Sequence, residues 1–217
     1  MFGPGNDAID GTGQGGQGLD MRARLDRLED YWRELRGSAQ LPARADIDPV
    51  RIDTILPHCF IAERVAPTVL RLRVAGSRLG DVLGMDVRGM PLSALFDPAG
   101  RTTLAAHVDR VFDGPRIFEM SVTIPRSFGR AALPGRLLML PLLDGSGRVS
   151  RVIGAIVWDG ETGRVGRRFS VPKDMVMRSE PVDMAPAARE DTPEMPLRAP
   201  VIRKVAGARL ELVVDNT

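Results

Sequence analysis

The chain has 217 residues, of which 43% are hydrophobic and 27% charged, a balance typical of a soluble globular domain with extensions. A formal net charge of +2 is too small to indicate nucleic-acid binding, so we expect no nucleic-acid partner. The single cysteine, Cys59, excludes a disulfide within the chain and fits a reducing, cytoplasmic setting.

The first 19 residues are rich in glycine, with seven glycines among residues 1–18. Ordering so many glycines costs much backbone entropy, so residues 1–19 are predicted to form a flexible tail. The segment from Gly11 to Gly16 has the spacing GxGxxG. No predicted strand precedes it and no lysine follows, so it does not indicate a phosphate-binding loop.

An amphipathic helix is predicted over residues 20–36, ended by Gly37. Its apolar residues recur at spacings of three and four: Leu25, Leu28, Tyr31, Trp32 and Leu35. The opposite side of the helix is charged. The stripe has two interpretations: it packs on the core of its own chain, or it packs against a second subunit, in which case these five residues form a dimer interface.

The next predicted elements alternate short strands with short helices. Pro42 and Pro49 favour an extended connection over residues 38–49. We then expect a short helix at 51–56, strands at 58–66 and 68–75, short helical turns between 76 and 96, and a longer helix at 99–112.

Three further strands are predicted at 115–125, 136–143 and 149–158. The strand at 136–143 is apolar on both faces, so both faces of the sheet need a cover. The N-terminal helix, a second subunit or both could supply the second cover. The apolar run from Leu137 to Leu143 is only seven residues long, whereas a membrane helix takes about 20, so we expect no membrane association.

Residues 161–217 are predicted to form a mostly irregular tail, because prolines interrupt every possible element. One short strand is possible at 208–214. The folded domain is therefore expected at residues 20–160.

This order of elements, together with several short motifs, resembles the PAS-domain family, and in particular small single-domain regulators common in alphaproteobacteria. The motifs that carry the resemblance are Tyr31-Trp32, Leu41-Pro42, Asp46–Pro49, Ile55–Pro57, Leu72–Ser77, Gly84, Gly89 and Leu92. The resemblance implies an α+β fold, with a five-stranded antiparallel sheet, short helices on one face and a preceding amphipathic helix. It also implies a sensor or interaction domain that acts by binding other proteins.

A ligand pocket, if the domain has one, is expected between the 99–112 helix and the sheet. His107 lies on the apolar stripe of that helix, and the other candidate lining residues are Phe112, Phe118, Met120 and Val122. The alternative interpretation is that these side chains simply fill the core. Some haem-binding PAS sensors project a histidine from the corresponding helix, so His107 is a candidate haem ligand, although a half-buried histidine bonded to backbone is the simpler interpretation.

The sequence does not indicate an enzyme. It has two histidines and no Gly-x-Ser-x-Gly or His-x-x-x-His motif. Cys59 follows His58 directly, and neighbouring residues of a strand point to opposite faces, so the two cannot readily form a catalytic pair. We therefore expect no catalytic residues and no metal site.

The expected function is a non-enzymatic, cytoplasmic signalling module that forms a homodimer and docks onto partner regulatory proteins. The alternative is a sensor domain that binds a small ligand, haem or flavin. We expect no cofactor under the first interpretation, and haem or flavin remains possible under the second.

Overall fold

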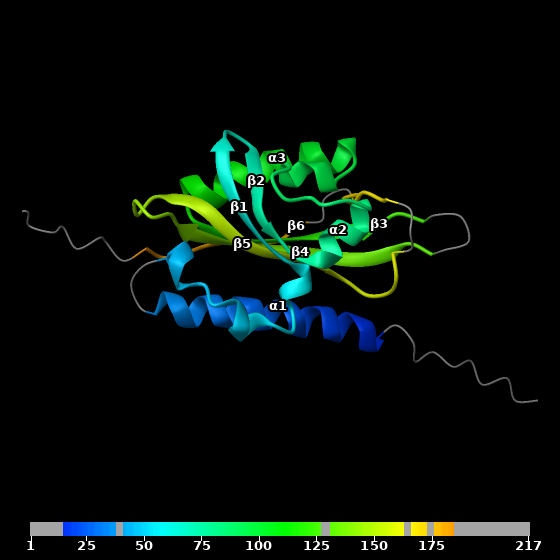
Figure 1. Cartoon of the computed structure of the whole chain (residues 1–217), viewed down its shortest axis with the longest axis horizontal. Helices are drawn as coiled ribbons and strands as arrows, with labels where there is room; N and C mark the ends of the chain where they lie inside the picture. The colour runs from blue at the N-terminus through cyan, green and yellow to red at the C-terminus, as the bar shows by residue number, and fades with distance from the viewer. Residues whose placement is uncertain (1–14, 38–40, 127–130, 163–165, 173–175, 185–217) are drawn as a thin grey trace, which may run out of the picture. The chain divides into compact units, whose positions relative to one another are not determined.

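The computed structural model describes residues 15–37, 41–126, 131–162, 166–172 and 176–184 (Figure 1). Its centre is one antiparallel sheet of six strands in the order β2-β1-β5-β4-β3-β6. The strands are β1 (Cys59–Ala66), β2 (Val69–Ala75), β3 (Arg116–Ile124), β4 (Leu133–Leu143), β5 (Val149–Trp158) and β6 (Val176–Pro181). The predicted α+β class and antiparallel sheet are confirmed.

Helices cover both faces of this sheet. The α-helices are α1 (Gly15–Arg36), α2 (Ser77–Leu83) and α3 (Pro98–Asp113), and the short 3-10 helices are η1 (Arg44–Asp46), η2 (Pro49–Ile52), η3 (Leu56–His58) and η4 (Leu92–Leu95). Figure 1 shows α1 along one face, with α2 and α3 on the other. We call these the α1 face and the α3 face of the sheet.

Local sequence explains where the two longer helices end or begin. Asp97 caps α3, because its carboxylate accepts a hydrogen bond from the Gly100 N–H at 2.7 Å, and Pro98 supplies the first helical residue. Gly37, with φ of +57°, follows the last residue of α1 in the left-handed conformation that glycine adopts without strain.

Each face of the sheet has its own buried core. On the α3 face, strand residues such as Phe60, Leu72 and Ile156 pack with side chains of α2, η4 and α3. On the α1 face, the alternate strand residues, such as Ile61 and Ile153, pack with α1 and with the segment from Leu41 to Ile55. The period of two along each strand therefore divides the apolar residues between two layers.

The structure corrects two predicted boundaries. The sheet has six strands rather than five, because β6 pairs with β3 inside the region 161–217 that was predicted to be mostly irregular. Helix α1 begins at Gly15, within the predicted tail of residues 1–19. Residues 1–14 and the possible strand at 208–214 lie outside the described residues.

Candidate functional site

The apolar residues predicted to line a ligand pocket are core residues. Phe112, Phe118, Met120 and Val122 are each at most 5% exposed and belong to the core of the α3 face. Neither of the two pockets described below is lined by them. At these positions the side chains contribute to the packed core between α3 and the sheet.

His107 lies half-buried on α3, with its ring stacked on Phe118 at 5.2 Å between centroids. Its Nδ1 atom is buried and has no hydrogen-bond partner among the described residues. Burial and, to a smaller extent, the charge of Arg110 lower the pKa of His107, which keeps the imidazole neutral. A neutral imidazole suits haem iron, but Phe118 occupies the ring's inner side, so the arrangement is that of a packed histidine.

His58 and Cys59 face opposite layers, as predicted. The His58 ring meets Trp158 edge-on at 4.9 Å, and its Nδ1–H donates a hydrogen bond of 2.9 Å to the Ile156 carbonyl. Burial is the main cause that lowers the pKa of His58. Cys59 belongs to the core of the α1 face, where burial raises the pKa of its thiol to about 12. The thiol is therefore not a nucleophile near neutral pH.

The apolar stripe of α1 packs on the chain's own sheet. Leu25, Leu28, Tyr31 and Trp32 are at most 5% exposed, and Leu35 is partly buried against the same core. The Trp32 indole N–H also donates a hydrogen bond of 2.9 Å to the Pro141 carbonyl of β4. These five residues were candidates for a dimer interface, and the structure corrects that assignment, because the sheet already buries them.

A buried charge network links α1 to β3 and β6, at the end of the sheet away from β2. Glu119 of β3 is 2% exposed and lies 3.1 Å from Arg136 and 3.3 Å from Arg22 of α1. Arg178 of β6 binds Glu29 of α1. Burial raises the pKa of Glu29, but the hydrogen bonds and charges of Arg178 and Arg33 outweigh it and lower the pKa overall. These ion pairs hold α1 against β3 and β6, and the carboxylates of Glu29 and Glu119 are already paired within the chain.

An apolar groove of about 450 Å³ opens on the α1 face, between the 44–57 segment and strands β1, β2 and β5. Ile61 and Ile153 pair across β1 and β5 and form its floor. Its walls are Ile47, Ile52 and Leu56 on one side and Val74 on the other. Leu56 is 37% and Val74 is 43% exposed, so apolar side chains at the lips of the groove face solvent.

Gly76 closes one end of this groove. Its N–H donates a hydrogen bond of 2.8 Å to the Cys59 carbonyl, which brings the end of β2 against η3. A Cβ atom at this position would overlap the carbonyl oxygens of Leu56 and Pro57. Only glycine therefore permits the close approach that shapes the groove.

Arginines gather beside the other end of the groove. On β1, Glu63 lies two residues beyond Ile61, and on β5, Arg151 lies two residues before Ile153, so both follow the floor on the same face. Glu63 binds Arg73 at 2.6 Å and lies 3.7 Å from Arg151. Arg71 pairs with Glu63 across β1 and β2. The carboxylate of Glu63 thus faces a surplus of guanidinium groups.

Arg44 extends this basic end. It lines the groove, and a bridge between Ala43 and Leu143 places it near the start of β5. The side chains of Arg44 and Arg71 have no ion-pair or hydrogen-bond partner among the described residues. These two positive charges are available to a partner.

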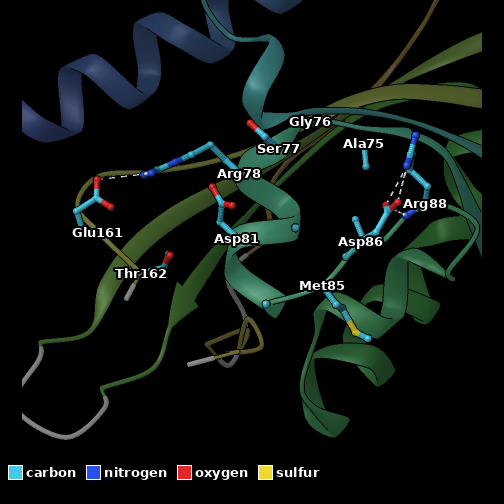
Figure 2. Close-up of a pocket in the computed structure, with 13 residues that line it drawn as sticks. Ala75, Gly76, Ser77, Arg78, Asp81, Met85, Asp86, Arg88, Glu161 and Thr162 are labelled. Atoms are coloured by element: carbon cyan, nitrogen blue, oxygen red, sulfur yellow. Dashed lines mark hydrogen bonds and ion pairs between the residues drawn. The ribbon is translucent and has the colours of Figure 1, made fainter. Parts of the chain in front are cut away.

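A second, polar pocket of about 870 Å³ surrounds α2 (Figure 2). Figure 2 shows Arg88 paired with Asp86 at one end, and Arg78 reaching toward Glu161 at the other. The Arg88 guanidinium lowers the pKa of Asp86 to about 2. Charged groups of both signs therefore line this pocket, and most of its charges are already paired within the chain.

Sequence reasoning missed both pockets. Their residues come from segments far apart in the chain, and no local motif marks them. Val50, in the run Asp46-Ile-Asp-Pro-Val-Arg-Ile-Asp53, lies next to the lining residue Pro49 without lining the groove itself, so it was only an indirect signal.

Two classes of site are not found in the described part of the chain. No group of three or more His, Cys, Asp or Glu side chains there could hold a metal ion. Within the same ranges, no helix combines the length and apolar character needed to cross a bilayer.

An antiparallel sheet with α2, η4 and α3 on one face and an amphipathic helix on the other defines a small α+β domain. The family model of the PAS domain matches residues 21–157, and the chain belongs to that family. No curated protein matches the chain significantly.

Solved structures of light-oxygen-voltage domains are similar to this chain at low identity. One, from work on a flavin analogue and the domain's mechanism, is 19% identical, with a TM-score of 0.39 and coverage of 54% of this chain and 87% of that one. The light state of the blue-light photoreceptor Aureochrome1 LOV is 14% identical, with a TM-score of 0.34 and coverage of 51% and 87%. An RNA-binding light-oxygen-voltage receptor is 19% identical, with a TM-score of 0.36 and coverage of 57% and 37%. At this distance, these likenesses say nothing about ligands.

Proposed function

We propose that this PAS domain is a non-catalytic signalling module that works through protein–protein contacts in the cytoplasm, forming a homodimer and docking onto partner regulatory proteins. The observation that carries the proposal is the exposed apolar groove on the α1 face. Two of the eight large hydrophobic side chains that are exposed in the described residues, Leu56 and Val74, stand at its lips above apolar walls and an apolar floor. Apolar side chains gathered in this way mark interaction surfaces.

Two further observations support a binding role over catalysis. The buried histidine His58 is bonded to a backbone carbonyl, and the Cys59 thiol has a strongly raised pKa, so neither supplies acid–base or nucleophilic chemistry at neutral pH. The candidate pocket residues under α3 fill the core. Among these features, the groove is the one whose exposed apolar surface would be buried by a bound partner.

The proposal is tested by placing a photo-crosslinking amino acid at Leu56, on the lip of the groove, in the cells that make the protein. A matched chain carries it at Met177 of β6, which is similarly exposed at 45%. We expect a covalent product with a protein at position 56 and much less at position 177. If position 56 gives no protein product, the proposed function is wrong.

A ligand sensor is the second candidate, favoured by the size and charged lining of the polar pocket around α2. Native and denaturing mass spectrometry of freshly purified protein, with an absorption spectrum, distinguishes the two. Extra mass that is lost on denaturation supports the sensor. Under the main proposal, the native mass is a whole number of bare chains.

A further inference from the structure

We infer that the apolar groove receives Val50 of a second copy of this chain, in a two-fold symmetric dimer. This inference rests on the proposed function and names the occupant of the same surface. Val50 is 76% exposed, the most exposed large hydrophobic side chain of the described residues, and its neighbour Pro49 lines the groove. A protruding apolar side chain and an apolar hollow therefore lie side by side on one face.

Val50 is held on a rigid turn. The Asp48 carboxylate accepts a hydrogen bond of 2.9 Å from the Val50 N–H, and Pro49 between them fixes the backbone. The Tyr31 hydroxyl accepts a further bond of 2.7 Å from the Asp48 N–H, which anchors the turn on α1. An apolar group presented in this way loses little conformational entropy on binding.

The charges around Val50 complement those around the groove. Asp46, Asp48 and Asp53 are exposed beside it. Arg44 and Asp53 line the groove, and on the strands beside it Arg71, Arg73 and Arg151 lie around the carboxylate of Glu63. When Val50 of one copy enters the groove of the other, its acidic flank approaches these arginines, and Arg44 and Arg71 gain the partners that they lack within the described chain.

A two-fold interface needs a surface that is complementary to itself. If residue A of one copy contacts residue B of the second, then B of the first contacts A of the second. Because the Val50 turn and the groove lie next to each other on the α1 face, one rotation places each turn in the opposite groove. A separate partner protein would have to supply both features, whereas a second copy supplies them by symmetry.

Sedimentation equilibrium of the full chain over a range of concentrations tests this directly. We expect the wild-type protein to form a dimer, and Val50→Asp and Val74→Arg each to raise the dimer dissociation constant about tenfold or more, as for loss of an apolar anchor. Met177→Asp, at the far edge of the sheet, is the control and should leave the constant unchanged. Because all three side chains are exposed, each variant should keep the wild-type circular dichroism and urea midpoint.

A charge exchange separates direct contact from indirect damage. In the inferred dimer, Arg44 of each copy faces Asp53 of the other. Arg44→Glu and Asp53→Arg should therefore each weaken self-association, because each variant places like charges opposite one another at both contacts. When the two variants are mixed, both contacts become attractive, and a mixed dimer should form more tightly than either variant alone. Asp53 is chosen because Asp48, which caps the turn, stays intact.

A wild-type protein that stays monomeric, a dimer unaffected by Val50→Asp and Val74→Arg, or a mixture that forms no mixed dimer would each overturn the inference. The photo-crosslinker at Leu56 separates its failure from that of the proposed function. A product of two chains supports both. A product with a different protein alone supports docking onto a partner protein and refutes the dimer through this groove, and no protein product refutes both.

Discussion

The two faces of the sheet are covered to different extents. On the α3 face, burial continues to the edge strand β2, where Leu70 and Leu72 are at most 2% exposed. On the α1 face, burial stops at β1: Ile61 is 6% exposed, whereas its partner Val74 on β2 is 43% exposed. The closed face provides stability, and the half-open face carries the groove that we propose as a contact surface. The same strands serve both purposes because their side chains alternate.

The largest expected effect tests whether the α1 layer is a true core. Trp32→Ala should lower the free energy of unfolding by about 3–5 kcal/mol, because it removes a fully buried indole and leaves the Pro141 carbonyl without its donor. Urea unfolding followed by circular dichroism measures the change. Phe118→Ala makes the same test on the α3 face. A loss below about 1 kcal/mol for Trp32→Ala alone would show that α1 is loosely attached.

The next effect concerns the charges that hold α1. Glu119→Ala should cost about 2 kcal/mol, less than the about 3–5 kcal/mol of a fully buried pair, because Arg136 and Arg178 keep about a quarter of their side-chain exposure. Glu34→Ala is the matched control. It breaks an exposed pair with Arg51 and should leave the urea midpoint nearly unchanged. Equal effects of the two variants would contradict the importance of the buried network.

A smaller effect follows from the buried histidine beneath α2. The pKa of His58 is lowered in the folded state, mainly by burial. Below pH about 6.5, His58 therefore binds a proton in the unfolded chain more readily than in the folded chain. The free energy of unfolding should fall as the pH drops from 7 toward 5. His107 contributes with the same sign.

Urea midpoints between pH 7 and pH 5 check this, and the slope should be shallower in His58→Phe and shallower still when His107→Phe is added. Glu29 has a lowered pKa because its charged form is stabilised in the fold. Its contribution to stability is therefore lost only as the pH falls below the ordinary carboxylate pKa, outside this pH range. A double variant with the wild-type slope would assign the pH dependence to other groups.

The smallest effect reports on opening of the groove. Cys59 borders the groove but is only 5% exposed, and its thiol has a pKa of about 12. An aromatic disulfide reagent should therefore label the native protein at least about tenfold more slowly than the urea-unfolded chain. The rate of absorbance change measures this. Labelling at the unfolded rate would mean that the half-open face opens fully in solution.

Local patterns predicted much of the fold. Alternation in residues 116–124 marked β3, and Asp97-Pro98 marked the start of α3. The strand β6 carried no such signal, because its sequence, Val-Met-Arg-Ser-Glu-Pro, does not alternate and its pairing partner β3 lies about 60 residues earlier. Periodicity showed that α1 has an apolar stripe but could not say which surface covers it.

The site was less predictable than the fold. The residues expected around a pocket under α3 lie in one core cluster, but whether a cluster encloses space depends on side-chain volumes and not on pattern. The apolar groove joins residues as distant as Arg44 and Ile153, and its shape depends on the close approach at Gly76.

The sixth strand has a practical consequence for handling the protein. The stretch shared with the PAS family ends at residue 157, yet β6, further along the chain, occupies the open side of β3. A chain shortened to the family boundary would leave the nine-residue strand β3 with unpaired N–H and C=O groups along one side, a template for uncontrolled sheet extension and precipitation. Retaining the residues up to Met184 should keep the shortened protein in solution where the shorter version forms aggregates.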